Sequence, residues 1–237
     1  MRLLAVFLFV LGLTLQSLAE PVRPYVGGSF GISTVNNNFM MEKNITGIDL
    51  SDHSGTDFQI EIGVTNDTYS GYIGYRSGSS TWDDGEIHHY FYEGYPVGDM
   101  NIKSSDLTSE HFIIGARAQL KVGLPELIRP VVGVGLSRGY VDRDVVYTPY
   151  NWGEAIPDND VERSETYESK TEYGGLMEFG FALRPKAPVQ IFLTYQIHAM
   201  MARYKTKQVS PVADQYEVRE NAIQLGIIYN FKTIGEE

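Results

Sequence analysis

The amino-acid sequence predicts an all-β protein, specifically an eight-stranded antiparallel up-and-down transmembrane β-barrel. Apolar residues alternate with polar or small residues along eight segments, which is the period of a β-strand with two different faces. Short and long connections alternate between these segments, as in membrane barrels with tight turns at one end and loops at the other. After the N-terminal region, no stretch approaches the roughly 18 consecutive apolar residues of a membrane helix.

Residues 1–19 have the features of a secretory signal peptide. A cation, Arg2, precedes an apolar run, and Ser17 and Ala19 place small residues at the −3 and −1 positions of a cleavage site. The run is shorter than the ~20 residues that a membrane-spanning helix needs, which weighs against an uncleaved anchor. We therefore expect export, cleavage after Ala19, and a barrel domain over residues 20–237 with four long surface loops.

Eight segments are expected to form the strands, and each is justified by its alternation. In chain order they are Tyr25–Ser33, Phe58–Val64, Thr68–Arg76, His111–Leu120, Arg129–Val141, Tyr173–Arg184, Val189–Met201 and Ile223–Phe231. The first, third and fifth are rich in glycine and give a weaker pattern. The last is the clearest, because Ile223, Leu225 and Ile227 share one face while Gln224 and Gly226 fall on the other.

The connections define the two ends of the predicted barrel. Three short ones lie at about Thr65–Asp67, Lys121–Ile128 and Arg184–Pro188, and four long ones cover roughly Thr34–Thr56, Ser77–Asp106, Asp142–Thr166 and Ala202–Tyr216. A soluble β-sandwich or lipocalin-like barrel is the competing fold, since its strands alternate too. Small and charged residues opposite the apolar face, together with aromatic residues near strand ends, favour the membrane form.

Four charged residues lie on the predicted lumen face: Glu61, Arg76, Arg117 and Glu178. Burying one charge alone is costly, whereas opposite charges neutralise one another, so we expect an interior network that fills and orders the barrel. Glycines on the same face, such as Gly63 and Gly115, would admit the bulk of these side chains in a narrow barrel. The functional alternative is a narrow gated pore whose opening exchanges the ion-pair partners.

The C-terminal strand resembles the assembly signal of bacterial outer-membrane barrels. Residues 224–231 read Gln-Leu-Gly-Ile-Ile-Tyr-Asn-Phe, and the residues that match the signal are Gln224, Gly226, Tyr229 and Phe231. The segment Pro24–Gly31 is similar to the first strand of small outer-membrane barrels of the OmpA-like and opacity-protein type. The resemblance implies a bacterial outer-membrane location, contact with outer-membrane lipid, and recognition by the barrel assembly machinery. The family signal usually ends the barrel with its aromatic residue, whereas Lys232–Glu237 follow here.

Composition excludes several classes of function. Nineteen Lys plus Arg against 30 Asp plus Glu give a net charge of −11, which argues against a nucleic-acid partner, since phosphate binding needs a basic face. The chain has no cysteine, which excludes disulfides, thiolate metal sites, iron–sulfur clusters and a cysteine nucleophile.

Histidines and acidic residues give no recognisable site in the sequence. His111 and His198 lie on the predicted lumen face, but neither belongs to a motif with a serine nucleophile. The adjacent His88 and His89, and the segment Asp158–Asp160, match no established ligand spacing. We therefore expect no enzyme activity, no cofactor and no metal.

Aromatic residues gather in the second and third long connections. The leading candidates for contact with a partner are Trp82, Tyr90, Tyr92, Tyr150 and Trp152, because large rings are costly to expose and are typical anchors of interfaces. The expected function is a structural or surface-recognition role, adhesin-like, carried by extracellular loops that meet an unidentified host or surface ligand. The alternatives are a narrow porin-like channel for small solutes and a lipid-modifying outer-membrane enzyme.

Overall fold

A computed structural model of the chain describes residues 22–37, 53–66, 68–92, 95–122, 127–150, 161–183, 188–203 and 215–232. The expected signal peptide over residues 1–19 lies outside them. The elements are all strands: β1 (Arg23–Asn37), β2 (His53–Thr65), β3 (Tyr69–Tyr92), β4 (Tyr95–Gln119), β5 (Ile128–Tyr150), β6 (Arg163–Tyr167), β7 (Glu172–Leu183), β8 (Val189–Arg203) and β9 (Gln215–Asn230). Among the described residues, no helix is long and apolar enough to span a membrane.

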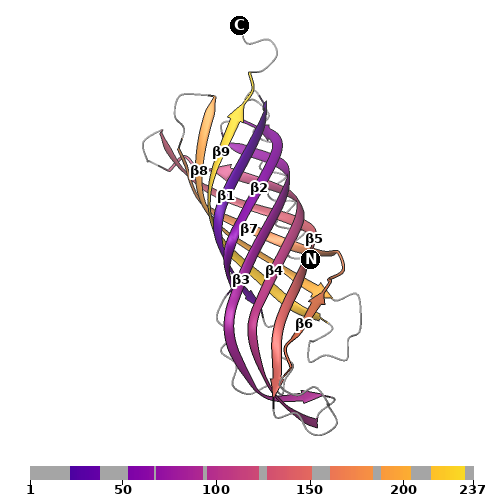
Figure 1. Cartoon of the computed structure of the whole chain (residues 1–237). Helices are drawn as coiled ribbons and strands as arrows, with labels where there is room; N and C mark the ends of the chain where they lie inside the picture. The colour runs from indigo at the N-terminus through magenta and orange to yellow at the C-terminus, as the bar shows by residue number, and fades with distance from the viewer. Residues whose placement is uncertain are drawn as a thin grey trace.

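Eight of the strands close into a ring, and this confirms the predicted fold. Each of β1 to β4 pairs with the next strand, β5 pairs with β7, and β7, β8 and β9 follow in order until β9 meets β1 (Figure 1). All of these pairings are antiparallel. The ninth strand, β6, stands outside the ring and pairs with β5 over residues 143–147.

The alternation seen in the sequence separates the lipid-facing side of the ring from its interior. In β9, Leu225 and Ile227 are more than half exposed, whereas Gln224, which precedes Leu225, is 1% exposed. β2 shows the same arrangement, with Ile60 and Ile62 facing outward and Glu61 buried. This is the reverse of the arrangement in a soluble protein. Apolar side chains on the outside and polar ones inside are typical of a membrane barrel.

Tight turns gather at one end of the ring, which we call the turn end. There the Asn66 side-chain oxygen accepts hydrogen bonds from the backbone N–H groups of Thr68 (2.9 Å) and Tyr69 (2.6 Å). This Asx-type turn reverses the chain between β2 and β3 without a long loop. The first residue of β1 and the last of β9 lie at the same end (Figure 1).

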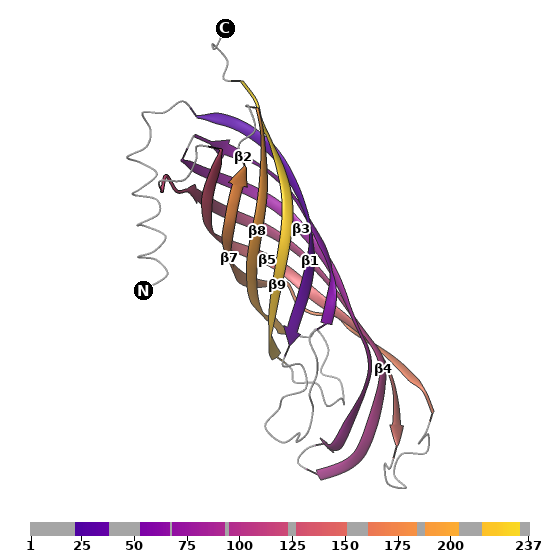
Figure 2. The same cartoon turned by 90° about the vertical axis from the view of Figure 1, so that its left-hand side faces the viewer.

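At the opposite end, β3, β4 and β5 run well past the ring, and together with β6 they form what we call the outer extension (residues 82–92, 95–105, 140–150 and 163–167). Figure 2 shows it bending away from the barrel. Register shifts between β3 and β4 at Ile87/Tyr90, and between β4 and β5 at Ile102/Ser104, mark irregularities of the kind that increase twist.

The outer extension corrects the loop boundaries expected from the sequence. Most of the range Ser77–Asp106 is a continuous β-hairpin rather than a loop, and β5 continues to Tyr150 inside the range expected to be the third loop. The sequence pattern missed these strands because both faces of the extension carry many polar residues. A hydrogen-bonded ladder outside the membrane does not need an apolar face toward lipid.

Candidate functional site

The barrel interior holds a first cluster of ion pairs near the turn end, built around Arg117 on β4. The Arg117 guanidinium contacts the Glu61 carboxylate, with 2.8 Å between Nη2 and Oε2, and its Nε lies 2.7 Å from Glu178 Oε2. Glu61 also accepts hydrogen bonds from the hydroxyl of Tyr25 (3.1 Å) and the side-chain amide of Gln59 (2.7 Å). Arg117 therefore links β2 to β7 across the lumen, and charge-assisted bonds of this kind are the strong ones.

Small residues make room for large rings beside this turn-end cluster. The Tyr72 ring lies under the Arg117 guanidinium, 4.2 Å from its carbon to the ring centroid. A Cβ added at Gly115 would lie 2.5 Å from the Tyr72 hydroxyl oxygen, and one at Gly63 would lie 2.8 Å from the Tyr25 ring. The glycines thus admit tyrosine rings, where the sequence suggested that they admit the charged side chains themselves.

A second cluster lies farther toward the extension and is built around the fully buried Arg76 on β3. Its Nη2 contacts the Asp57 carboxylate and lies 2.9 Å from Glu220 Oε1. The side-chain amide of Gln224 donates a 2.7 Å hydrogen bond to Asp57 Oδ2, and Gln196 Oε1 accepts one from Arg76 Nη1 at 3.3 Å. We call these residues the outer cluster. It ties β2, β3, β8 and β9 together.

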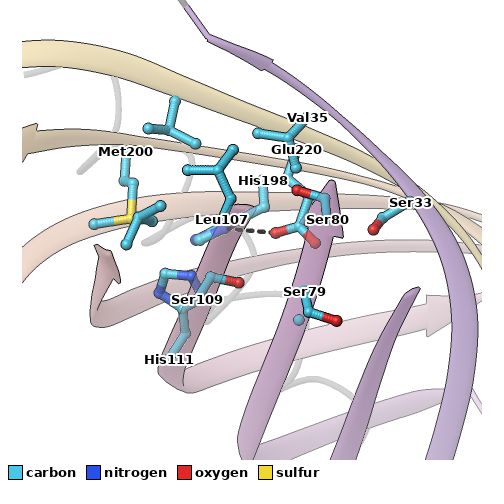
Figure 3. Close-up of a pocket in the computed structure, with 13 residues that line it drawn as sticks. Ser33, Val35, Ser79, Ser80, Leu107, Ser109, His111, His198, Met200 and Glu220 are labelled. Carbon is cyan, nitrogen blue, oxygen red and sulfur yellow. Dashed lines mark ion pairs between the residues drawn. The ribbon is translucent and has the colours of Figure 1, made fainter. Parts of the chain in front are cut away.

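Two histidines meet at the level of the outer cluster, where His111 is paired with Arg76 and His198 with Glu220 (Figure 3). The rings of His111 on β4 and His198 on β8 pack edge to face with 4.4 Å between centroids. His198 Nε2 lies 2.7 Å from Ser137 Oγ, and its Nδ1 lies 3.8 Å from Glu220 Oε2. A cavity of about 10 Å³, just enough room for one water, opens beside these side chains and is also lined by Ser80.

The structure divides the predicted interior charges between the two clusters. Glu61, Arg117 and Glu178 meet near the turn end, while Arg76 belongs to the outer cluster. The sequence analysis missed both acidic partners of Arg76. Asp57 and Glu220 precede the segments that were expected to be strands, but each continues the same lumen-face alternation, Asp57 with Gln59 and Glu220 with Gln224.

The aromatic belt ends a few residues before the outer extension begins. The Tyr75 ring lies 6.3 Å from that of Phe58 and 5.5 Å from that of Phe112, so three neighbouring strands share an aromatic row. Beyond it, exposed positions of β3 and β4 are polar, as at Ser79 and Thr108. Rings at the level of lipid headgroups are typical of membrane barrels, so this row marks one boundary of the membrane-facing band.

The predicted recognition residues fall on the outer extension where they are described. The backbones of Trp82, Tyr90 and Tyr92 belong to β3, and that of Tyr150 is the last residue of β5. Trp152 lies outside the described residues. The strand β4 runs between the other two, pairing Ser105 with Trp82 and Asp99 with Tyr150, so one sheet carries both groups.

The predicted assembly-signal residues occupy both faces of β9 and its end. Gln224 is buried and bonded within the outer cluster, and Gly226 follows on the same face. Tyr229 and Phe231 are exposed at the turn end, with their rings edge to face at 5.2 Å. Their part in assembly stays a prediction.

Comparison with known proteins assigns the architecture. A family model for the outer membrane protein β-barrel domain matches residues 5–231. Neisserial surface protein A has 14% sequence identity and a TM-score of 0.52, covering 90% of this chain and 100% of that one. OprG from Pseudomonas aeruginosa has 10% identity and a TM-score of 0.47, covering 89% and 97%, and Ail of Yersinia pestis has 12% and 0.41, covering 88% and 99%. No curated protein sequence matches the chain.

Proposed function

The chain belongs to the family of outer membrane protein β-barrel domains, and we propose that it is a bacterial surface protein that recognises a partner through its outer extension. Its interior clusters then act as a structural plug, and the turn end faces the periplasm, as short turns do in this class of barrel. The observation that carries the proposal is the projection of paired strands beyond the membrane-facing band.

The lengths of the strands support a projecting recognition element. β3, β4 and β5 have 24, 25 and 23 residues, whereas β2 and β7 have 13 and 12. A transmembrane strand needs about 9–11 residues. At about 3.3 Å per residue, the surplus of the long strands reaches roughly 30 Å beyond the others. A paired sheet is also preorganised, which lowers the entropy lost when a partner binds.

The composition of the β3–β4 hairpin indicates the chemistry of the partner. Residues 82–106 contain six Asp or Glu and one Lys, together with five aromatic residues. Acidic groups attract a partner of opposite charge and raise its rate of association, and aromatic rings supply anchors once the surfaces meet. We therefore propose a partner with a basic surface.

The register of the hairpin permits a precise excision. Thr81 and Asp106 are paired, so replacing residues 82–105 by Asn-Gly closes the two strands with a two-residue turn and leaves the ring ladder intact. Cells that display the parent protein should adhere to a surface coated with a basic protein more than cells without it. The excised variant should return adhesion to that background while it still assembles.

A second variant tests the acidic charges of the hairpin without changing its length. Asp83→Asn, Asp84→Asn and Glu86→Gln together keep the aromatic residues and the hairpin length, and they should lower adhesion to the basic coat without abolishing assembly. Adhesion to a coat of neutral protein is the control. Unchanged adhesion of the excised variant would contradict the proposal, and failure of that variant to assemble would show that the hairpin is a folding element of the barrel.

A further inference from the structure

We propose that His111, His198 and Glu220 form a binding site for one divalent transition-metal ion, with Zn²⁺ as the reference ion, inside the barrel. Each residue offers one ligand atom, and these atoms all lie within 4.8 Å of one another. Two imidazole nitrogens and one carboxylate oxygen, completed by water, are a ligand set that zinc uses in proteins. Figure 3 shows the three side chains converging beside the cavity.

His111 supplies the first independent argument, because its ring lacks any partner for its nitrogens. The residue is 1% exposed, and neither Nδ1 nor Nε2 has a hydrogen-bond partner among the described residues. Buried polar atoms are normally satisfied, since leaving one unpaired costs free energy. A metal bond to one of these nitrogens satisfies it where no side chain does.

His198 is held in the orientation that a ligand needs. In the tautomer that carries its proton on Nε2, the ring donates to Ser137 Oγ at 2.7 Å, and an ion between Nδ1 and Glu220 Oε2, which lie 3.8 Å apart, would accept the Nδ1 lone pair. Ligating histidines usually donate their second ring nitrogen to a neighbouring oxygen in this way, which fixes both the tautomer and the ring. Ser137 is thus a positioning residue for the site.

The charge around the site favours a cation. Asp57 and Glu220 carry two negative charges against the single positive charge of Arg76, and all three are buried. Arg76 occupies Oε1 of Glu220, which leaves Oε2 for the ion. The net charge of −1 that remains attracts a cation, and this attraction is strong where little water is present to screen it.

Ser137, His198 and Glu220 are also arranged in the order of a hydrolytic triad. Metal binding must therefore be distinguished from hydrolysis at this site. Ser137 is 3% exposed and is not among the residues that line the cavity, whereas all three ligand residues line it. This difference favours ion binding over ester hydrolysis at the site. Zinc bonds of about 2.0–2.2 Å require the ligand atoms, which lie within 4.8 Å of one another, to draw closer when the ion binds.

The site would connect opposite walls of the ring. His198 and Glu220 lie on the neighbouring strands β8 and β9, while His111 comes from β4, four strands from β9 in either direction around the ring. An ion held by all three would cross-link the two walls at the level of the outer cluster. Because it would bind the folded barrel and not the unfolded chain, it should stabilise the protein.

The test is a titration of the purified, folded barrel in detergent micelles with Zn²⁺ by calorimetry, and with Co²⁺ by absorption spectroscopy. We expect one ion per chain and visible Co²⁺ bands of a nitrogen-containing site. His111→Gln removes no hydrogen bond of the described structure, so it should fold and bind about tenfold or more weakly; Ser137→Ala should weaken binding by roughly tenfold through loss of the orienting contact. Zn²⁺ should raise the unfolding midpoint of the parent but not that of His111→Gln.

The control variants remove His88 and His89, the only adjacent histidine pair in the sequence. The double variant His88→Gln/His89→Gln should bind as the parent does, and so should the variant with residues 82–105 replaced by Asn-Gly, which keeps this test independent of the recognition proposal. Absence of stoichiometric binding by the parent, or binding that persists in His111→Gln and disappears in the His88/His89 variant, would overturn the site. Ester hydrolysis that depends on Ser137 and is indifferent to chelator would identify a triad instead.

Discussion

Burial decides what an ion pair contributes at the scale of a single residue. Arg117 and Lys103 each contact a glutamate, but the Arg117 side chain is 6% exposed while those of Lys103 and Glu162 are 55% and 54% exposed. A buried carboxylate that loses its cation keeps an uncompensated charge, whereas an exposed one returns to water. The two pairs therefore form a matched comparison within one protein.

Arg117→Met should lower the free energy of unfolding by about 3–5 kcal/mol, because it leaves Glu61 and Glu178 buried without their cation. Lys103→Met, the control, should change it by less than about 1 kcal/mol. Urea unfolding in phospholipid vesicles, followed by tryptophan fluorescence, measures both. Equal effects of the two substitutions would mean that water reaches the turn-end cluster freely.

The sequence predicted which residues face the lumen, but not which side chains they contact there. Alternation alone assigned His111 and His198 to the lumen, and both are buried there. Their contact depends on the diameter and strand stagger of the closed barrel, which no spacing along the chain reveals. For the same reason the sequence treated Arg76 and Arg117 as one network, where the structure gives each its own acidic partners.

At the scale of the element, a long strand of this barrel has a membrane-facing part with apolar residues on its outer face and a further part with polar residues there. On β3, Ile73 and Tyr75 face outward within the membrane-facing band, and Ser79 and Thr81 are exposed beyond it. The sequence analysis ended this strand at Arg76, where the apolar alternation ends. Backbone pairing continues beyond it because the ladder of hydrogen bonds does not depend on apolar side chains, so hydrophobic pattern predicts the membrane part of a strand and not its full length.

This division predicts that the free-energy cost of an arginine substitution depends on its depth in the membrane. Leu225→Arg, within the apolar band of β9, should cost about 2–4 kcal/mol, while Ser79→Arg, beyond the aromatic row, should cost about 0–1 kcal/mol. Folding efficiency into vesicles, and the heat-dependent shift of the folded band on gels, report the difference. A Leu225→Arg variant as heat-resistant as the parent would show that the lipid-facing register is wrong.

At the scale of the whole molecule, the two clusters cross the lumen at two levels. Arg117 connects β4 to β2 and β7, and Arg76 connects β3 to β2 and β9, so each spans the ring from within. An eight-stranded barrel is only wide enough for side chains to fill it. A conducting path would have to break both sets of buried ion pairs at once.

The parent protein should therefore give no ohmic conductance steps in planar lipid bilayers. The variant with residues 82–105 replaced by Asn-Gly should also stay closed, because the clusters lie inside the ring and the excised hairpin lies beyond it. Folded insertion of both proteins is checked by their heat-dependent gel shift. Reproducible steps from the parent would favour the narrow channel over the plug, and steps from the excised variant alone would show that the hairpin, rather than the ion pairs, seals the barrel.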